Sequence, residues 1–339
     1  MAYYAAKRFN YWGQLGILAA FTGAGLVLGA IASFIPLMGK IDLFGMKDPA
    51  EAMKKLLVPE NAERLRWSQF LSTLFLFMLP PFLYAWVCHR KPLLHLGFTQ
   101  KTGIAAVIVV ILMMLACLPV VSGFQDLTEA YPWSKEMLQK FKAAEESYNR
   151  QVAVMARMNN FWDYIVAVIV IALLPAVFEE VLFRGAMQSL FSRWTRMPVF
   201  SIVLTAIIFS AVHGSYLGFL SRFALGFVLG WMYYRSGNIW LNIIAHFVNN
   251  ALAVTALYMY TKPGEKVDPS KIDESSPLWL VALAAAALVF LFFLFEKIIQ
   301  KNSDRPGEEV LLPGYNFDKG PFNNDFAAPT VKPNNDSWR

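Results

Sequence analysis

The chain has 339 residues, of which 57% are hydrophobic and 16% charged, and its mean hydropathy is +0.43. A soluble domain usually has about 25% charged and 45–50% apolar residues, so the composition argues against a soluble enzyme, a disordered chain and a disulfide scaffold. The apolar residues occur in blocks, which indicates a polytopic membrane protein built as one bundle. The net charge of +6 would suit nucleic acid only if it were concentrated in a basic block.

Eight apolar stretches approach the about 20 residues that a helix needs to cross a ~30 Å hydrocarbon core. They cover approximately residues 12–37, 68–88, 103–121, 161–191, 198–213, 216–234, 239–260 and 278–299. The sequence therefore predicts an all-α fold, a polytopic membrane bundle of about eight transmembrane helices within residues 1–300. The first stretch begins like a signal peptide, but it continues through Leu37, which favours an uncleaved span.

The charges between these stretches alternate in kind along the chain. The connections around 38–67, 124–160 and 261–277 mix acids with bases, whereas others hold Lys or Arg without an acid (Lys7, Arg8; Arg90, Lys91, Lys101; Arg193, Arg196; Arg235). Under the positive-inside rule, this pattern places both termini in the cytoplasm. We therefore expect an integral protein of a bacterial inner membrane, with the lipid bilayer as a partner. The positive charge is mostly topological, so nucleic acid is not expected as a partner.

Two segments outside the spans have distinct patterns. In residues 131–157, Ser134 precedes apolar residues three or four apart, which predicts an amphipathic helix that lies on the surface or caps the bundle. Residues 301–339 are rich in Pro, Asn and Asp and lack an apolar pattern, so we expect a disordered cytoplasmic tail. Cys88 and Cys117 lie in or beside apolar spans, where cysteine more often fills space than binds metal.

The stretch 161–191 contains three ionisable residues in an apolar run: Glu179, Glu180 and Arg184. Such a group costs about 2.5–3.5 kcal/mol at mid-membrane on insertion scales and usually marks function. Glu180 and Arg184 are four residues apart on one helix face, so they can form an ion pair. Glu179 is turned about 100° away from Glu180 and is left as a free carboxylate, which suits a general base.

Two other stretches carry histidines, His213 at the end of 198–213 and His246 within 239–260, where Asn249 and Asn250 follow. His246 and Asn250 are four apart and share a helix face. Each feature alone would suit an ordinary interhelical hydrogen bond. Together with Glu179 they indicate a site, because all lie on otherwise apolar spans.

This set of residues supports two kinds of hydrolytic chemistry. A carboxylate and a histidine can hold and deprotonate a water, while a second histidine and an amide stabilise an oxyanion. One glutamate and two histidines are also the ligand set of a catalytic zinc site. The residues alone leave both versions open.

At these positions the chain resembles the CPBP intramembrane proteases, which include the type II CAAX prenyl endopeptidases and the Abi-like bacterial proteins. The matching motifs are Glu179-Glu180…Arg184, Phe209…His213 and His246…Asn250, within about residues 160–260. Three motifs in this order on separate apolar stretches form a specific signal.

The resemblance implies a helical endopeptidase acting on a peptide or membrane-protein substrate, with its cavity open to the cytoplasm. Glu179 and His213 would activate the water, and His246 and Asn250 would hold the oxyanion. Glu180, Arg184 and Phe209 would support the site. We expect no certain cofactor and prefer a metal-free glutamate mechanism, with Zn²⁺ on Glu179, His213 and His246 as the other version.

Two alternatives belong to other classes: a non-catalytic immunity or scaffold protein of the same fold, and a proton-coupled transporter. The shared-water chemistry requires Glu179 and His213 to lie within about 10 Å of each other. We therefore expect both helices to continue past these residues, with 216–220 prolonging the fifth stretch. The sequence does not identify the substrate, its cleavage site or the oligomeric state.

Overall fold

The computed structural model describes residues 9–39, 55–98, 102–260 and 276–301, which form helices joined by loops. The predicted all-α membrane bundle is confirmed; the predicted tail, from residue 302 on, lies outside the described residues. The helices are α1 (Tyr11–Phe34), α3 (Ala62–Thr73), α4 (Leu79–Cys88), α5 (Pro92–His95), α6 (Ile104–Ala130), α7 (Lys135–Met155), α8 (Phe161–Ala167), α9 (Leu174–Glu180), α10 (Ser189–Thr195), α11 (Pro198–Ala211), α12 (Phe219–Ser236), α13 (Ile239–Tyr260) and α14 (Leu278–Lys301). Short 3₁₀ segments, η1 (Ile35–Leu37) and η2 (Pro59–Asn61), and wider π-helical segments, η3 (Leu74–Met78), η4 (Val168–Leu173) and η5 (Val181–Gln188), extend or join them.

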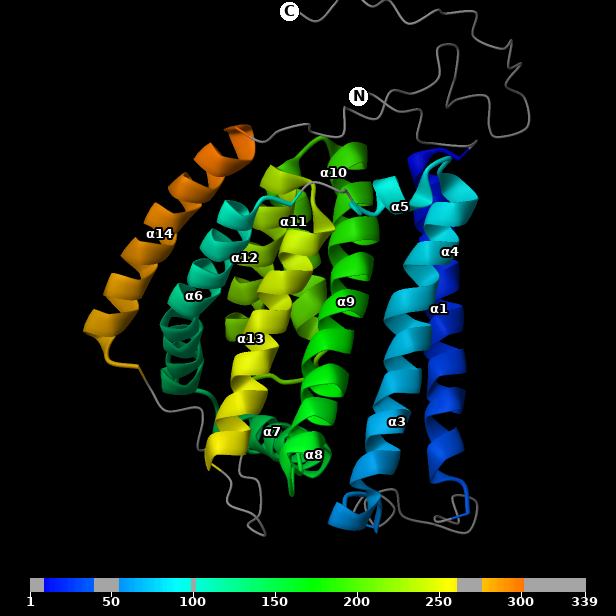
Figure 1. The fold of residues 1–339 in the computed structure, drawn as a ribbon. Helices are drawn as coiled ribbons and strands as arrows, with labels where there is room; N and C mark the ends of the chain where they lie inside the picture. Colours follow the sequence, from blue (N-terminus) through cyan, green and yellow to red (C-terminus); the bar gives the residue numbers. More distant parts are fainter. Residues whose placement is uncertain (1–8, 40–54, 99–101, 261–275, 302–339) are drawn as a thin grey trace, which may run out of the picture.

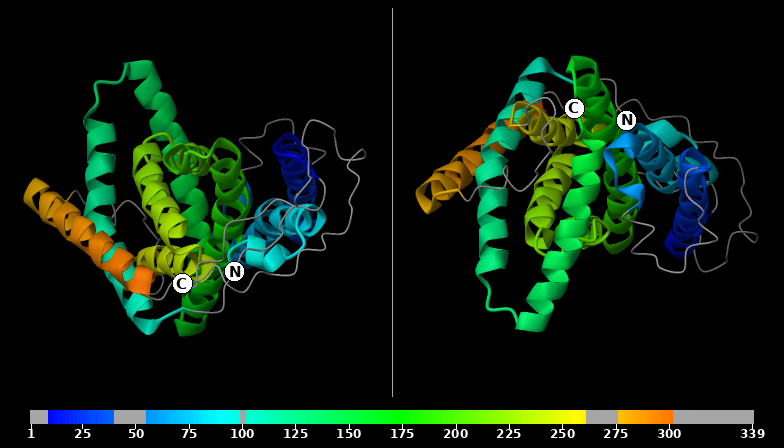
Figure 2. Two further views of the ribbon diagram at one scale, coloured as in Figure 1. Left: turned by 90° about the horizontal axis from the view of Figure 1, so that it is seen from above. Right: turned by 90° about the horizontal axis from the view of Figure 1, so that it is seen from below.

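The bundle has two ends, which we call the α10 end and the α7 end after the helices that lie there in Figure 1. Seen from above, α1, α3 and α4 form one side of the molecule, α6 and α14 lie toward the other, and α8 to α13 lie between them (Figure 2). The central helices and the loop between α11 and α12 carry all the motif residues, so the outer helices lie on both sides of the site.

Six helical stretches within the described residues are long and apolar enough to cross a membrane. They are Tyr11–Leu37, Pro59–Cys88, Ile104–Ala130, Phe161–Thr195, Ile239–Met259 and Leu278–Ile299. The remaining two predicted spans are α11, which has 14 residues and a length of about 21 Å, and α12, which has 18. These two form an antiparallel pair joined by a loop of residues 212–218.

The prediction that the fifth stretch continues as a helix past His213 is wrong. Helix α11 ends at Ala211, and His213 lies in the 212–218 loop. Gly214 has a φ of +66°, a left-handed conformation that glycine adopts without penalty and that commonly ends a helix. His213 therefore reaches the bundle interior from the loop that follows the short helix α11.

Phe161–Thr195 is continuous although it contains Pro175. Proline lacks an N–H and clashes with the carbonyl four residues before it, and the wide turn η4 immediately precedes this proline. The same arrangement occurs where η3 precedes Pro80 and Pro81. Because the helix is not broken, Glu179 lies in its middle, well inside the bundle as predicted.

Glycines bring α12 close to its neighbours. A Cβ atom added at Gly226 would lie 3.1 Å from the ring of Phe209, and one added at Gly230 would lie 2.9 Å from Ile202. The closeness of α12 to α11 therefore depends on residues without side chains.

The predicted amphipathic helix is confirmed as α7, with Ser134 as its N-cap: the Ser134 hydroxyl accepts a hydrogen bond from the Met137 N–H. Three contacts join α7 to the segment that follows His213. Glu145 accepts a hydrogen bond from Ser215 at 2.5 Å, Phe141 stacks on Tyr216 at 4.7 Å, and Arg222 lies 5.1 Å from the Tyr148 ring centre. Helix α7 thus covers the loop that carries His213.

Candidate active site

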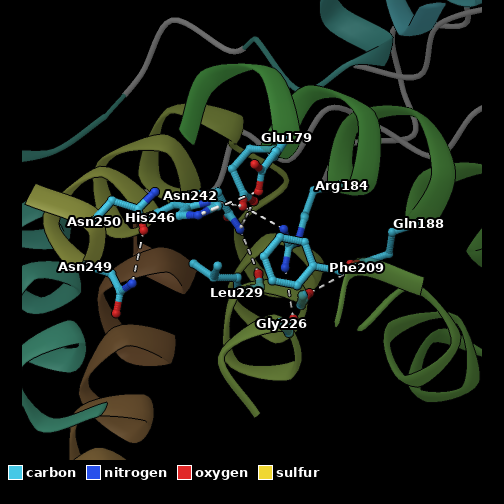
Figure 3. A network of polar contacts seen from close by, with 12 residues as sticks. Glu179, Arg184, Gln188, Phe209, Gly226, Leu229, Asn242, His246, Asn249 and Asn250 are labelled. Carbon is cyan, nitrogen blue, oxygen red and sulfur yellow. Dashed lines mark hydrogen bonds and ion pairs between the residues drawn. The ribbon is translucent and has the colours of Figure 1, made fainter. Parts of the chain in front are cut away.

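Glu180 is the centre of a buried polar network, and Figure 3 labels its partners Arg184, His246 and Asn242. Its Oε1 accepts hydrogen bonds from Arg184 Nη1 at 2.6 Å and from His246 Nδ1 at 2.8 Å, and its Oε2 accepts one from Asn242 Nδ2 at 3.2 Å. The Glu180 and Arg184 side chains are completely buried. The predicted pair is therefore present, and it also links the helix Phe161–Thr195 to α13.

Arg184 extends this network to α12 and to Phe209. Its Nη2 donates to the Gly226 carbonyl at 3.1 Å, and its guanidinium carbon lies 4.8 Å from the centre of the Phe209 ring. The Phe209 ring also contacts His213 at 4.9 Å and His246 at 5.8 Å between ring centres. Phe209 thus packs against the guanidinium of the buried ion pair and against both histidine rings.

Glu179 has a different environment from its neighbour Glu180. Its Oε2 is buried, yet none of the described residues gives it a hydrogen bond. The same oxygen lies 3.9 Å from Nε2 of His213 and 3.9 Å from Nε2 of His246. The structure thus brings together one glutamate and two histidines from three separate motifs, well within the 10 Å limit set above.

Hydrogen bonds at Nδ1 orient both imidazole rings. His213 Nδ1 lies 2.7 Å from the Phe209 carbonyl, which can only accept, so His213 carries a proton on Nδ1. His246 Nδ1 faces the Glu180 carboxylate, which likewise acts as an acceptor when ionised. Both Nε2 atoms are therefore turned to Glu179 and remain available for chemistry.

Asn250 lies on α13 one turn beyond His246, and its neighbour Asn249 holds its amide. Asn249 Nδ2 donates to Asn250 Oδ1 at 3.2 Å. This bond fixes the oxygen of Asn250 toward Asn249, so the amide nitrogen is on the other side, as Figure 3 shows. Asn250 is thus oriented as a donor, although it does not join the Glu180 network among the interactions of the described residues.

Sequence reasoning missed Asn242, which is completely buried and bonds both Glu180 and the Leu229 carbonyl. The available signal was its position four residues before His246 on an apolar helix, which places both side chains on one face. It also missed Arg222, which lies under α7 on the first turn of α12. No local pattern points to Arg222, because its surroundings come from α7 and the 212–218 loop.

A cavity of about 650 Å³ lies between α3 and the α8–η4 segment, near the α7 end. Its lining combines apolar side chains with charged ones, including Trp67, Phe70, Leu174, Glu63, Arg66 and Asp163. The Phe70 ring contacts Phe178, the residue before Glu179, at 6.3 Å between centres. One side chain, that of Phe178, therefore lies between Phe70 in the cavity wall and the helix turn that carries Glu179.

The side-chain positions fit a zinc site less well than they fit a water molecule held by Glu179 and His213. Ligands of a tetrahedral zinc with bonds of about 2.0–2.2 Å lie about 3.4 Å apart, whereas both Glu179–histidine separations are 3.9 Å. No group of three His, Cys, Asp or Glu side chains in the described part of the chain has metal-binding spacing. One water can bond Glu179 and His213 together, because two hydrogen bonds of about 2.8 Å easily span such a gap.

The fold and this cluster define an integral membrane protein with a carboxylate–histidine site inside its helical bundle. Residues 161–252 match the sequence model of the type II CAAX prenyl endopeptidase Rce1-like family. This match confirms the family resemblance over the segment that contains every motif residue.

Among curated proteins, the chain is similar to an uncharacterized protein, YpbD, of Bacillus subtilis (strain 168). The two are 36% identical over 89 residues, which are 25% of this chain and 42% of that relative. The chain thus matches less than half the length of this relative. No solved structure matches the chain significantly.

Proposed function

We propose that the protein is an intramembrane endopeptidase that hydrolyses a peptide bond of a membrane-associated or peptide substrate. The observation that carries the proposal is the Glu179 carboxylate, whose Oε2 is buried, lacks a hydrogen-bond partner among the described residues, and lies 3.9 Å from two Nε2 atoms. A buried oxygen without a partner is costly unless a ligand or water completes it. Water held between Glu179 and His213 would complete it and be ready for reaction.

The proposed reaction uses groups of this chain throughout. Glu179 accepts a proton from the water, and the resulting hydroxide attacks the carbonyl carbon of the substrate peptide bond. The tetrahedral intermediate then collapses as the proton held by Glu179 passes to the leaving nitrogen. His213, fixed through Nδ1 by the Phe209 carbonyl, accepts a hydrogen bond from the water at Nε2 and orients it.

His246 and Asn250 would stabilise the oxyanion as donors. The bond from Asn249 holds the Asn250 oxygen, so the amide nitrogen of Asn250 is the group turned away from Asn249 to donate. His246 donates from Nε2 only as the imidazolium, since its Nδ1 proton is already directed at Glu180. The hydrogen bond to Glu180 fixes the orientation of the His246 ring, which gives the buried network a part in catalysis as well as in packing.

We also propose that the α10 end is cytoplasmic in a bacterial inner membrane, because basic residues gather there: Arg90, Lys91 and Arg196 in connections, and Arg193 and Arg235 in the last turns of α10 and α12. The helix residues from Val181 to Ala186 are all buried, which closes the site on this side. On the α7 side, Val212 and Tyr216 are more than half exposed. The site would then open toward the far side of the membrane, unlike the cytoplasmic opening that the resemblance implies.

A sidedness measurement tests this orientation. Cys88 and Cys117 are buried, so a Tyr216→Cys variant provides one exposed thiol within the described residues. In intact bacterial cells, a membrane-impermeant maleimide should label this variant and leave the parent protein unlabelled. Labelling only after cell lysis would contradict the orientation.

The cavity between α3 and α8–η4 would hold an apolar segment of the substrate beside the site. Its apolar lining reaches Phe70 and Leu174, and its charged rim lies nearer the α7 end, a polarity that suits a chain entering from the membrane surface. A bulky residue at the cavity wall, as in Val170→Trp, should raise KM for a membrane-anchored reporter more than for a short soluble peptide.

A cleavage assay on purified full-length protein in lipid nanodiscs tests the proposed function. A library of quenched-fluorescence peptides should be cleaved by the wild type, while Glu179→Ala and His213→Ala each lower the rate by about 10²–10⁴-fold. Equal cleavage by wild type and both variants would refute the assignment. A wild type that cleaves nothing, with both variants unaltered in folding, would favour the scaffold or transporter alternatives.

Metal analysis of the same preparation separates the two mechanistic versions. A protein that is active at substoichiometric zinc and insensitive to chelator supports water activation by Glu179 and His213 alone. One zinc ion per chain, lost together with activity on chelation and restored on its return, would replace that version with a metal-assisted one.

A further inference from the structure

Arg222 lies on the face of α12 that packs against α11. Gly226, one turn further along α12, contacts Phe209 and Ala206, and its carbonyl accepts the hydrogen bond from Arg184. Residues four apart share a helix face, so Arg222 lies one turn closer to the α7 end than this contact. Arg222 is therefore placed below the buried Glu180–Arg184 pair, on the side where the site is partly exposed.

The guanidinium of Arg222 is held between α7 and the loop that carries His213. It packs directly over Gly218, at the end of the 212–218 loop, and lies 5.1 Å from the ring centre of Tyr148 on α7. It is close enough to act electrostatically on His213. Arg222 thus belongs to the wall of the candidate active site, although it lies outside all three motifs.

The charge of Arg222 lacks the partner that the other interior arginines have. Its Nη1 is buried, and no described residue accepts a hydrogen bond from it. Arg184 is paired with Glu180, and Arg66 donates to two backbone carbonyls. Helix α7 packs against Arg222, and its Glu145 accepts a hydrogen bond from the Ser215 hydroxyl at 2.5 Å.

We propose that Arg222 binds a carboxylate of the substrate, either the C-terminal carboxylate of a peptide or an acidic side chain near the cleaved bond. The inference rests on the proposed function, because it places this carboxylate beside the peptide bond held at Glu179 and His213. A guanidinium matches the planar geometry of a carboxylate with two parallel hydrogen bonds. The bound carboxylate satisfies the buried Nη1 and fixes the direction in which the peptide crosses the site.

Tyr148 and Gly218 prepare Arg222 for this role. The Tyr148 ring lies within cation–π distance of the guanidinium, and the absence of a side chain at Gly218 leaves the space that the guanidinium occupies. A neutral substrate gains nothing from this arrangement, so Arg222 acts on selectivity rather than on the chemical step.

The experiment compares matched reporter peptides on full-length protein in nanodiscs. Peptides of one cleavable sequence end in a carboxylate or an amide, and a second pair carries Glu or Gln beside the cleaved bond. The wild type should prefer one carboxylate form over its neutral form by about 10- to 100-fold in kcat/KM. Preference within the first pair identifies a C-terminal carboxylate, and preference within the second an acidic side chain.

Arg222→Gln should abolish the preference, so that this variant cleaves the carboxylate peptide and its neutral match with equal kcat/KM. Arg222→Lys should keep part of it. Arg150→Gln is the matched control, because Arg150 lies on α7 two residues from Tyr148 and pairs with Glu146 at the surface; this variant should keep the full preference. A wild type without preference, or an Arg222→Gln variant equally impaired on both peptides, would overturn the proposal.

A binding measurement separates this proposal from the proposed function. The same peptides, carrying a fluorophore, are titrated with Glu179→Gln protein and followed by anisotropy. Tighter binding of the carboxylate peptide that is lost in the Glu179→Gln, Arg222→Gln double variant supports the Arg222 assignment even if the wild type cleaves none of the peptides. Equal binding of carboxylate and neutral peptides overturns it even if cleavage depends on Glu179.

Discussion

Glu179 and Glu180 are adjacent residues with opposite surroundings. Glu180 accepts hydrogen bonds from Arg184, His246 and Asn242, and its side chain is completely buried. The Glu179 side chain is 10% exposed, and its Oε2 has no hydrogen-bond partner among the described residues. The difference follows from the helix, which turns two consecutive side chains about 100° apart, one into the packed core and the other to the histidines.

This contrast extends to the two sides of the site. Toward the α10 end, the side chains from Val181 to Ala186 are buried, and Glu180 and Arg184 form an ion pair. Toward the α7 end, Glu179, His213 and Arg222 lie beside a loop and a surface helix. Stability should therefore depend mainly on the first group and activity on the second, and four predictions test this division.

The largest effect on stability is expected for Glu180→Ala. The change leaves Arg184 buried without its carboxylate, which should lower the free energy of unfolding by about 3–5 kcal/mol. Glu296→Ala is the control, because it breaks the partly exposed Arg235–Glu296 pair of 2.9 Å and should cost at most about 1 kcal/mol. Thermal denaturation in detergent would rank the two, and equal melting temperatures would contradict the account.

A smaller loss is expected for Asn242→Ala. The change removes one donor from Glu180 and leaves the Leu229 carbonyl without its 2.7 Å bond, which should cost about 1–3 kcal/mol. Asn249→Ala serves as the comparison, because Asn249 contacts the amide of Asn250 and not Glu180. Asn249→Ala should lower kcat while its melting temperature stays close to that of the wild type. A melting temperature lower for Asn249→Ala than for Asn242→Ala would count against a structural role for Asn242.

Glu145→Gln tests whether α7 helps to position His213. Glu145 holds Ser215, whose hydroxyl also accepts the Gly218 N–H at 3.0 Å and so shapes the 212–218 loop. We expect a loss of about threefold to tenfold in kcat, because small misplacements of a catalytic group are costly. The neighbouring Glu146→Gln changes the surface ion pair with Arg150, of 3.6 Å, and should leave kcat unaltered. Equal effects of the two variants on kcat would show that α7 does not position His213.

The smallest effect concerns a second buried polar cluster, at the α10 end, where the His95 ring stacks on His89 at 3.4 Å and contacts Arg193 at 3.4 Å. Burial, with the charges of His89 and Arg193, holds the pKa of His95 well below its usual range. The unfolded chain binds this proton below about pH 6.5 and the folded chain does not. Stability should therefore be constant above that pH and fall as the pH drops below it.

Thermal denaturation between about pH 7.5 and 5.5 would measure this dependence. Below about pH 6.5, the melting temperature of His95→Gln should decrease less steeply than that of the wild type. Identical pH profiles of the two proteins would contradict a neutral His95 in the folded protein. Peptide cleavage should not share this dependence on His95, because His95 contacts Tyr84, His89 and Arg193, which lie outside the three motifs.

Much of the architecture could be predicted from the sequence, because a membrane helix is encoded by consecutive apolar residues and by spacings of three or four residues. The apolar stretches, the ion pair four residues apart, the amphipathic α7 and the motif residues were all accessible in this way. The end of α11 was predicted wrongly, although Gly214 directly after His213 is the kind of residue that ends a helix. The prediction relied instead on residues 216–220, which could prolong the apolar helix.

The contacts that complete the site could not be predicted, because they join residues far apart in the chain. Ser215 meets Glu145 across 70 residues, and Asn242 meets Glu180 across 62. Arg222 looks like an ordinary charge at the start of a helix until α7 and Gly218 are placed around it. Such positions depend on packing between helices rather than on periodicity within one.

The most direct test of the division between the two glutamates is a side-by-side measurement of Glu179→Gln and Glu180→Gln for both reporter cleavage and melting temperature. We predict that Glu179→Gln melts like the wild type and has lost cleavage, while Glu180→Gln melts at a lower temperature. A Glu179→Gln variant that cleaves at the wild-type rate, or that is destabilised as much as Glu180→Gln, would contradict the account.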